Sequence, residues 1–137
     1  MPLVSIEVVN LLTQEKETAL MKAVYSALKE VFQLSDDAIN IRLFAHEPHR
    51  FAIPPTKNKS GTYMHPELYT VISIDCFSGR TIETKRRLYR RLAENLEICG
   101  IPQDHIKIVL RENSRENWGI LGGQAGCDAD VGYKVEV

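Results

Sequence analysis

The first half of the chain alternates between apolar and polar positions in a way that predicts one helix between two strands. Residues 4–8 alternate Val, Ile and Val with Ser and Glu, which is typical of a strand with one buried face. A helix is expected from about Thr13, a good N-cap residue, because apolar positions then recur at helical spacing. These positions are Leu20, Ala23, Val24, Ala27, Leu28 and Val31. A turn is expected at residues 35–37, and residues 39–43 alternate again as a second strand.

The second half of the chain repeats this order of elements. Residues 71–76 predict a strand, and a helix is expected from near Thr81, with leucines at positions 88, 92 and 96 on one face. Gly100 suits the end of this helix because glycine tolerates the left-handed backbone conformation found there. Residues 106–110 then predict a fourth strand.

The two halves align at an offset of 67 residues, which places Ile-Asn-Ile at 39–41 on Ile-Lys-Ile at 106–108. The chain is therefore expected to be an α+β protein of two tandem β-α-β units, at about residues 2–47 and 69–112. Right-handed crossovers would place both helices on one face of a four-stranded sheet. The other face and the strand edges would need cover, which indicates an oligomer.

Two segments interrupt the repeat within an expected single domain of residues 1–137. Residues 47–67 form a long, proline-rich loop, and such loops are usually functional or disordered. In the tail, residues 113–137, the glycines at 119, 122 and 123 are expected to form a turn. Residues 132–137 are expected to form a short final strand that could pair with a neighbouring subunit.

Composition and charge narrow the possible partners and the compartment. The formal net charge of −1 gives no electrostatic argument for binding nucleic acid or an anionic membrane. No apolar run approaches the ~18 residues needed to span a bilayer, and the N-terminus lacks the features of a signal peptide. Cys76, Cys99 and Cys127 are too widely spaced for a disulfide framework or a zinc motif, so a cytoplasmic location and no metal site are expected.

Pro2 directly follows the initiator methionine, so removal of Met1 would leave a secondary amine at the start of a strand. Residues 70–73 and 78–85, which include Gly79-Arg80-Thr81, and residues 112–120, which include Trp118, are similar to signatures of the tautomerase superfamily. Together with the tandem repeat, they make the chain resemble the fused, double-length members of that superfamily. The resemblance is to relatives of malonate semialdehyde decarboxylase and 4-oxalocrotonate tautomerase.

This resemblance implies a tautomerase/MIF-like fold, a homotrimer, and no metal or organic cofactor. It also implies an isomerase that interconverts keto and enol forms of a small 2-keto or 2-hydroxy carboxylate, with Pro2 as general base or acid. A free α-amino group has a pKa near ~8, and an apolar pocket would lower that pKa further. Pro2 would then be neutral at physiological pH, where a general base works best.

The resemblance also implies roles for residues beyond Pro2. Arg80 matches an arginine that binds the substrate carboxylate, which a planar guanidinium does through two hydrogen bonds. Trp118 matches an aromatic residue of the pocket wall, and Phe77 ends the adjacent segment and is expected at the pocket. His46 matches a histidine of the decarboxylase-like branch and could orient substrate or donate a proton. Ordinary packing is the alternative for Trp118 and His46.

Two other functions stay open. The first is a decarboxylase or hydratase that acts on a three-carbon acid, with protonated Pro2 and with Asp37 as its helper. The decarboxylase's catalytic aspartate aligns with Ala38, one residue from Asp37, and its second arginine has no match in residues 74–77. The second is a non-catalytic trimeric module that binds a metabolite, which the missing arginine favours.

Overall fold

The structure, a computed structural model, describes residues 2–53, 57 and 59–137 and contains two long helices and six strands within them. The helices are α1 (Gln14–Phe32) and α2 (Ile82–Ile98). The strands are β1 (Leu3–Val9), β2 (Asn40–His46), β3 (Thr70–Phe77), β4 (Ile106–Asn113), β5 (Gly119–Ile120) and β6 (Gln124–Ala125). Short 3-10 helices cover Pro48–Arg50, Pro66–Leu68, Gln103–His105 and Arg115–Asn117.

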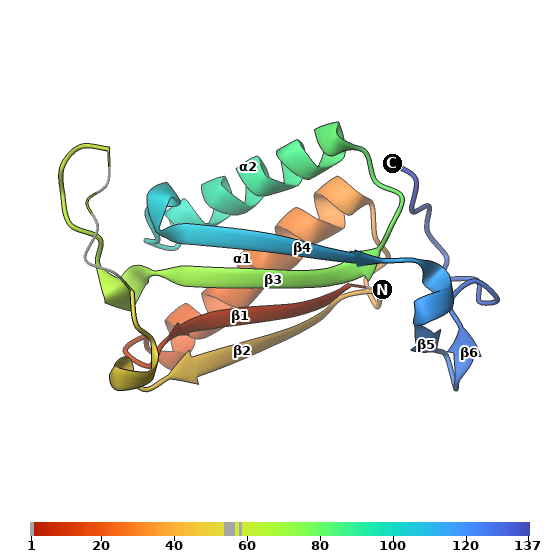
Figure 1. Cartoon of the computed structure of the whole chain (residues 1–137), viewed down its shortest axis with the longest axis horizontal. Coiled ribbons are helices and arrows are strands. Elements are labelled where there is room, and N and C mark those ends of the chain that lie inside the picture. Colours follow the sequence, from red (N-terminus) through yellow and green to blue (C-terminus); the bar gives the residue numbers. More distant parts are fainter. Residues whose placement is uncertain (1, 54–56, 58) are drawn as a thin grey trace.

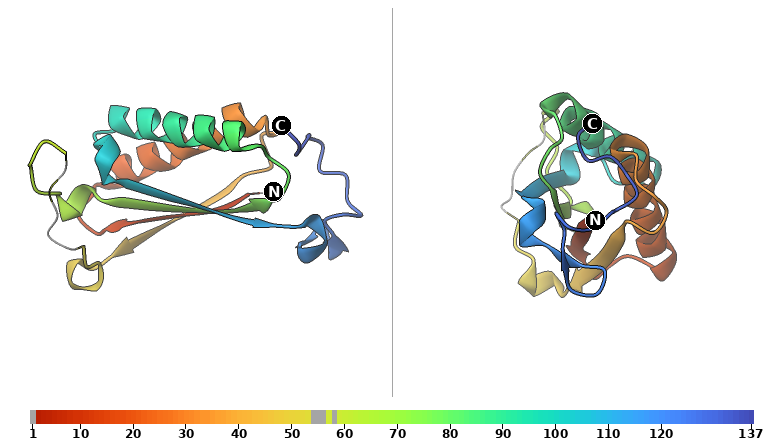
Figure 2. Two further views of the ribbon diagram at one scale, coloured as in Figure 1. Left: turned by 45° about the horizontal axis from the view of Figure 1, so that its top comes forward. Right: turned by 90° about the vertical axis from the view of Figure 1, so that its right-hand side faces the viewer.

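Four strands form one sheet in the order β2-β1-β3-β4. Strand β1 is parallel to β2, β3 is parallel to β4, and the central strands β1 and β3 are antiparallel to each other. Both helices lie on one face of this sheet (Figure 1 and Figure 2). The predicted α+β fold of tandem β-α-β units is therefore confirmed.

The two helices begin in the same way, at the predicted threonines. Thr13 and Thr81 both have φ −74° and ψ 160°, and the side-chain oxygen of each accepts a hydrogen bond of 3.2 Å from a backbone N–H three residues on. Such N-caps satisfy a donor that the helix itself cannot. Helix α2 is followed by Gly100 at φ 92°, as the sequence predicts. The caps are 68 positions apart, so the second repeat has one extra residue before its helix.

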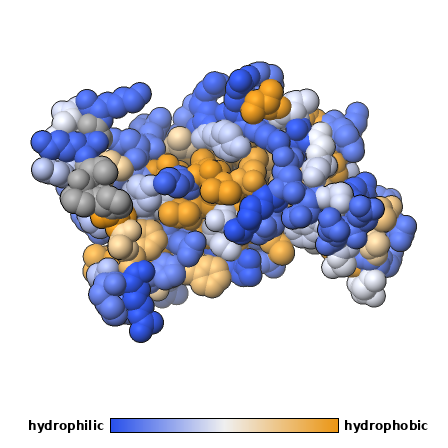
Figure 3. All heavy atoms as spheres, in the orientation of Figure 1, coloured by the Kyte–Doolittle hydropathy of each residue, from blue (hydrophilic) through white to orange (hydrophobic). Residues whose placement is uncertain are grey.

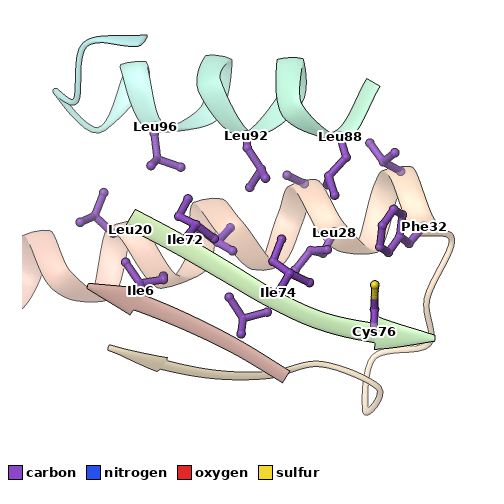
Figure 4. Close-up of a cluster of buried hydrophobic side chains, with 14 of the residues drawn as sticks. Ile6, Leu20, Leu28, Phe32, Ile72, Ile74, Cys76, Leu88, Leu92 and Leu96 are labelled. Carbon is purple, nitrogen blue, oxygen red and sulfur yellow. The ribbon is translucent and has the colours of Figure 1, made fainter. Parts of the chain in front are cut away.

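The hydrophobic core lies between the helices and the sheet (Figure 4). Leu88, Leu92 and Leu96 of α2 are fully buried, and they point toward the sheet beside α1. The sheet supplies the alternate residues of β1 and β3 that face the helices. The fully buried ones are Val4, Ile6, Ile72 and Ile74. No helix in the described residues is long and apolar enough to cross a membrane.

The opposite face of the sheet presents apolar side chains to solvent in the single chain. Leu3, Phe44 and Val109 are 37%, 44% and 42% exposed. Figure 3, seen from the side on which the strands lie in front of α1, shows apolar side chains gathered among polar ones over this face. Strands β2 and β4 are the two edges of the sheet.

The tail differs from the prediction at residues 132–137, which form no strand. The backbone oxygen of Val137 instead accepts hydrogen bonds from the Thr81 N–H (3.3 Å) and the Thr84 hydroxyl (2.8 Å) at the start of α2. Val135 is buried against the rest of the chain. The predicted final strand is therefore wrong, because burial against a helix end produced the same alternating pattern. The glycine turn is confirmed for Gly122 and Gly123, which have positive φ between β5 and β6, but not for Gly119, which begins β5.

The predicted loop at residues 47–67 lies partly outside the described residues, at positions 54–56 and 58. In its described part, Lys57 and Tyr63 form an antiparallel bridge.

Candidate active site

Pro2 lies at the end of the sheet where β1 begins. It is buried, and its carbonyl accepts a hydrogen bond of 3.2 Å from the Asn40 N–H. Leu3, the next residue, pairs with Asn40 of β2 on one side and Asp75 of β3 on the other. Pro2 therefore lies between the first residue of β2 and the last residues of β3.

A pocket of about 250 Å³ opens beside Pro2. It is lined by Pro2, Leu3, Asp37, Ala38, Ile39, Asn40, Trp118, Gly119 and Ile120. Its walls come from the turn before β2 and from the beginning of the β5–β6 hairpin, which lies at the same end of the molecule as the N-terminus (Figure 1). The structure thus brings together three of the predicted residues, Pro2, Asp37 and Trp118, in a largely apolar cavity.

Phe77 joins this pocket to Arg80. Its ring meets the Trp118 ring edge-on, with centroids 5.3 Å apart at 84°, and its backbone carbonyl accepts a hydrogen bond of 3.2 Å from Arg80 Nη1. Phe77 is itself buried and supports the Trp118 wall from behind. Phe77 and Arg80 are thus neighbours of the residues that line the pocket.

Arg80 is 6% exposed, which is rare for an arginine. Its guanidinium carbon lies 3.8 Å from the centroid of the Phe32 ring, a cation–π contact at the end of α1. Burial lowers the pKa of Arg80, and the nearby Cys76 and Tyr133 oppose that shift. Arginine nonetheless stays charged in proteins. Its Nε is buried with no hydrogen-bond partner among the described residues.

The C-terminal tail covers the same end of the molecule (Figure 2). The Tyr133 side chain packs against the core, and its hydroxyl is buried without a partner in the described part of the chain. Burial raises the pKa of Tyr133, whereas Arg80 and Arg115 lower it. Arg115 holds the preceding stretch by donating to the carbonyls of Gly126 (3.1 Å) and Ala129 (2.9 Å).

His46 lies at the opposite end of β2 from Asn40, the strand position beside Pro2. Because Asn40 pairs with Leu3 and His46 with Val9, the two ends are separated by roughly 20 Å of strand. His46 Nε2 is 3.0 Å from Glu7 Oε1, and its ring stacks on Phe51. Within one chain, the structure does not bring His46 to the Pro2 pocket.

Sequence reasoning missed Asn40, Ile120 and Tyr133 as neighbours of this site. Asn40 and Ile120 line the pocket because of where the chain turns, and neither residue type marks a site by itself. Tyr133 falls in the segment where the sequence predicts a strand, and only the tertiary fold brings it near enough to influence Arg80. No local signal in the sequence could have found it.

The comparisons with known proteins agree with this geometry. The family model described as tautomerase enzyme matches residues 38–121. The FG41 malonate semialdehyde decarboxylase inhibited by 3-bromopropiolate is 27% identical and superposes with a TM-score of 0.79 over 90% of this chain and 92% of its own.

Two further structures show the same fold at lower identity. A malonate semialdehyde decarboxylase studied in wild-type, mutant and inactivated forms is 22% identical, with a TM-score of 0.78 over 90% of this chain and 93% of its own. A fused 4-OT described as an asymmetric trimer is 17% identical, with a TM-score of 0.78 over 92% of this chain and 97% of its own. Since the family model covers well over half of the sequence and the fold agrees throughout, the chain belongs to the tautomerase enzyme family.

Proposed function

We propose that this protein is a cofactor-independent tautomerase that interconverts the keto and enol forms of small 2-keto or 2-hydroxy carboxylates. The observation that carries the proposal is the burial of Pro2 at a largely apolar pocket whose wall includes Trp118. An amine in such surroundings is favoured in its neutral form, so its pKa falls toward the pH at which a general base is most effective.

In the proposed reaction, Pro2 moves one proton and no atom is gained or lost. The neutral amine takes the proton of the enol hydroxyl, and the resulting ammonium returns a proton to the adjacent carbon as the C=O bond forms. Trp118 excludes water from the pocket, which keeps the proton on this path.

Arg80 is proposed to hold the substrate carboxylate. One of its nitrogens is used by the Phe77 carbonyl, while its Nε–H is buried and has no partner in the described residues. A guanidinium offers Nε–H and an Nη–H side by side, which matches the two oxygens of a carboxylate. Its positive charge would also stabilise the enolate as negative charge moves onto oxygen.

A second candidate function is the decarboxylation or hydration of a three-carbon acid. Asp37 favours it, because this carboxylate lines the same pocket as Pro2. In that reaction protonated Pro2 would polarise the substrate carbonyl, and the bond to the carboxylate carbon would break as carbon dioxide leaves. The electrons of that bond would form an enolate, which then takes up a proton at carbon. The FG41 malonate semialdehyde decarboxylase, at 27% identity, supports this alternative.

The assembly is proposed to be a homotrimer in the cytoplasm. The exposed apolar residues on the helix-free face of the sheet support an oligomer, and a fused 4-OT of similar fold is described as a trimer. Cys76, Cys99 and Cys127 are free, which suits a reducing compartment.

The proposal is tested by intact mass and by two assays over a range of pH. The expected mass is that of a chain without Met1. The rate of enol-phenylpyruvate ketonisation is expected to fall as pH falls, because protonated Pro2 cannot act as a base. Release of carbon dioxide from malonate semialdehyde that fails as pH rises, and is lost in Asp37→Asn, would instead establish the second candidate. Turnover of neither substrate would contradict both and leave a trimeric metabolite-binding module.

A further inference from the structure

Three hydrogen-bond donors at the Pro2 end of the molecule are buried and unused. They are Arg80 Nε, Trp118 Nε1 and the Tyr133 hydroxyl, and none of them has a partner among the residues that the structure describes. Buried polar groups are nearly always hydrogen-bonded, so each exception calls for an explanation. Three donors at one end of a fold indicate a place where an oxygen-rich ligand binds.

Arg80 and Tyr133 belong to one electrostatic cluster. Each shifts the pKa of the other, and Cys76 acts on both. Val135, two residues after Tyr133, packs against Gly79, the residue before Arg80.

Arg115 adds a second positive charge that acts on Tyr133, and its Nε and Nη2 donate to tail carbonyls. Glu112 and Glu136 also act on Arg80, and Glu112 is paired with Lys85, whereas the charged groups that act on Tyr133 are the two arginines. Each of the three unused groups can donate a hydrogen bond to an anion.

The tail is held in position at this cluster from two sides. The Val137 oxygen is bonded to Thr81 and Thr84 at the start of α2, directly after Arg80. Arg115 anchors the chain before Tyr133 through Gly126 and Ala129. Tyr133 thus lies on a segment whose ends are both tied to the elements that carry Arg80 and Trp118.

We infer that Tyr133 is a substrate-binding residue, whose hydroxyl donates a hydrogen bond to the carboxylate that Arg80 holds. This inference rests on the proposed function only in taking the ligand to be a small carboxylate. It makes the C-terminal tail part of the active site. A neutral hydroxyl donor beside a guanidinium favours a carboxylate over a neutral ester. In a carboxylate, one oxygen can accept from the hydroxyl while both accept from the guanidinium.

The first test measures binding without catalysis. Trp118 is the only tryptophan of the chain and lines the pocket, so its fluorescence should report the binding of pyruvate, a small 2-keto acid. Tyr133→Phe is expected to weaken this binding by about tenfold, in line with the loss of one hydrogen bond to a charged group. Tyr63→Phe is the matched control, since Tyr63 is exposed in the loop before β3 and the chemical change is the same.

Stability separates a ligand contact from a structural one. The Tyr133 hydroxyl has no partner within the described chain, so its removal is expected to leave the urea midpoint unchanged or to raise it. A lowered midpoint together with weakened binding would indicate a structural role and overturn the inference. Unchanged pyruvate binding would overturn it as well.

The second test uses two electrophiles that add to an amine. The Pro2 nitrogen would add to C4 of 2-oxo-3-pentynoate or but-3-yn-2-one, the alkyne carbon β to the ketone, and its proton would end on C3. Tyr133→Phe should slow labelling by the carboxylate reagent about tenfold and leave the uncharged ketone unaffected. Equal slowing of both would contradict the inference. Pyruvate binding without any labelling of Pro2 would contradict the proposed function and leave the inference standing.

Discussion

Arg80 is a buried cation whose surroundings are mostly rings and backbone. It packs on Phe32 and donates to the Phe77 carbonyl, and the described residues give it no ion-pair partner. A charge taken out of water in this way costs free energy unless another group compensates it. A negatively charged substrate would supply that compensation. Arg80 therefore lowers the stability of the empty protein and is well suited to bind an anionic substrate.

The pH dependence of stability should reveal the burial of Tyr133. Its pKa is raised above the ordinary value of 10.0, chiefly by burial, so the unfolded chain releases this proton at a lower pH than the folded chain does. The contribution of Tyr133 is therefore complete below about pH 10 and is lost as pH rises through the folded pKa. Urea unfolding should show that Tyr133→Phe loses less stability than the unmodified protein between about pH 9 and pH 11. Identical losses in the two proteins would contradict this account.

At the scale of elements, helix α2 contributes three fully buried leucines to the hydrophobic core. Leu92 is fully buried between α1 and the sheet, whereas Ile98 at the end of the same helix is 87% exposed. Leu92→Ala should lower the free energy of unfolding by about 2–5 kcal/mol, and Ile98→Ala should change it by less than about 0.5 kcal/mol. Urea unfolding measures both. Similar costs at the two sites would mean that α2 packs with another face.

The start of α2 also holds the tail, through a single side-chain hydrogen bond. Thr84 is buried, and its hydroxyl donates to the Val137 oxygen at 2.8 Å. Thr84→Val keeps the shape and removes the donor, so hydrogen exchange should become faster in residues 131–137 and remain unchanged in β1. The expected cost in stability is about 1 kcal/mol. Exchange that speeds up evenly along the chain would indicate global destabilisation instead.

The strands and helices could be predicted because short-range patterns decide them. Val4 and Ile6 alternate with polar residues, and Thr13 and Thr81 are good caps, so each element carries its own signal. The strand predicted in the tail was wrong for the opposite reason, because long-range contacts decide the structure there. Tyr133 and Val135 alternate with polar residues as in a strand, but Tyr133 is partly buried against the core and Val135 packs beside Gly79, and neither pairs with a strand. Such contacts depend on the whole fold.

The sequence predicted site residues from the family resemblance, and it missed residues that line the site only because of the tertiary fold. Pro2, Asp37 and Trp118 were predicted, and they line one pocket. His46 lies at the far end of the same sheet within the chain, because a strand of seven residues separates the two ends. An alignment position indicates which strand a residue is on, and the register decides which site it can reach.

At the scale of the whole molecule, the helix-free face of the sheet is the surface proposed to join subunits. Phe44 is 44% exposed on this face. Phe44→Asp should reduce the molar mass measured by light scattering from that of a trimer toward that of one chain, because a charge would be buried in the interface. Ile98→Asp, on the exposed end of α2, is the control and should leave the mass unchanged. A trimer that survives Phe44→Asp would place the interface elsewhere.

The measurement that tests the central claim most directly is the rate at which protein without Met1 converts enol-phenylpyruvate to its keto form, beside a Pro2→Ala variant. If the Pro2 amine is the catalyst, the variant should lose at least about tenfold in rate, or about 1.4 kcal/mol of transition-state stabilisation. Equal rates in the two proteins, or turnover no faster than in buffer, would contradict the account.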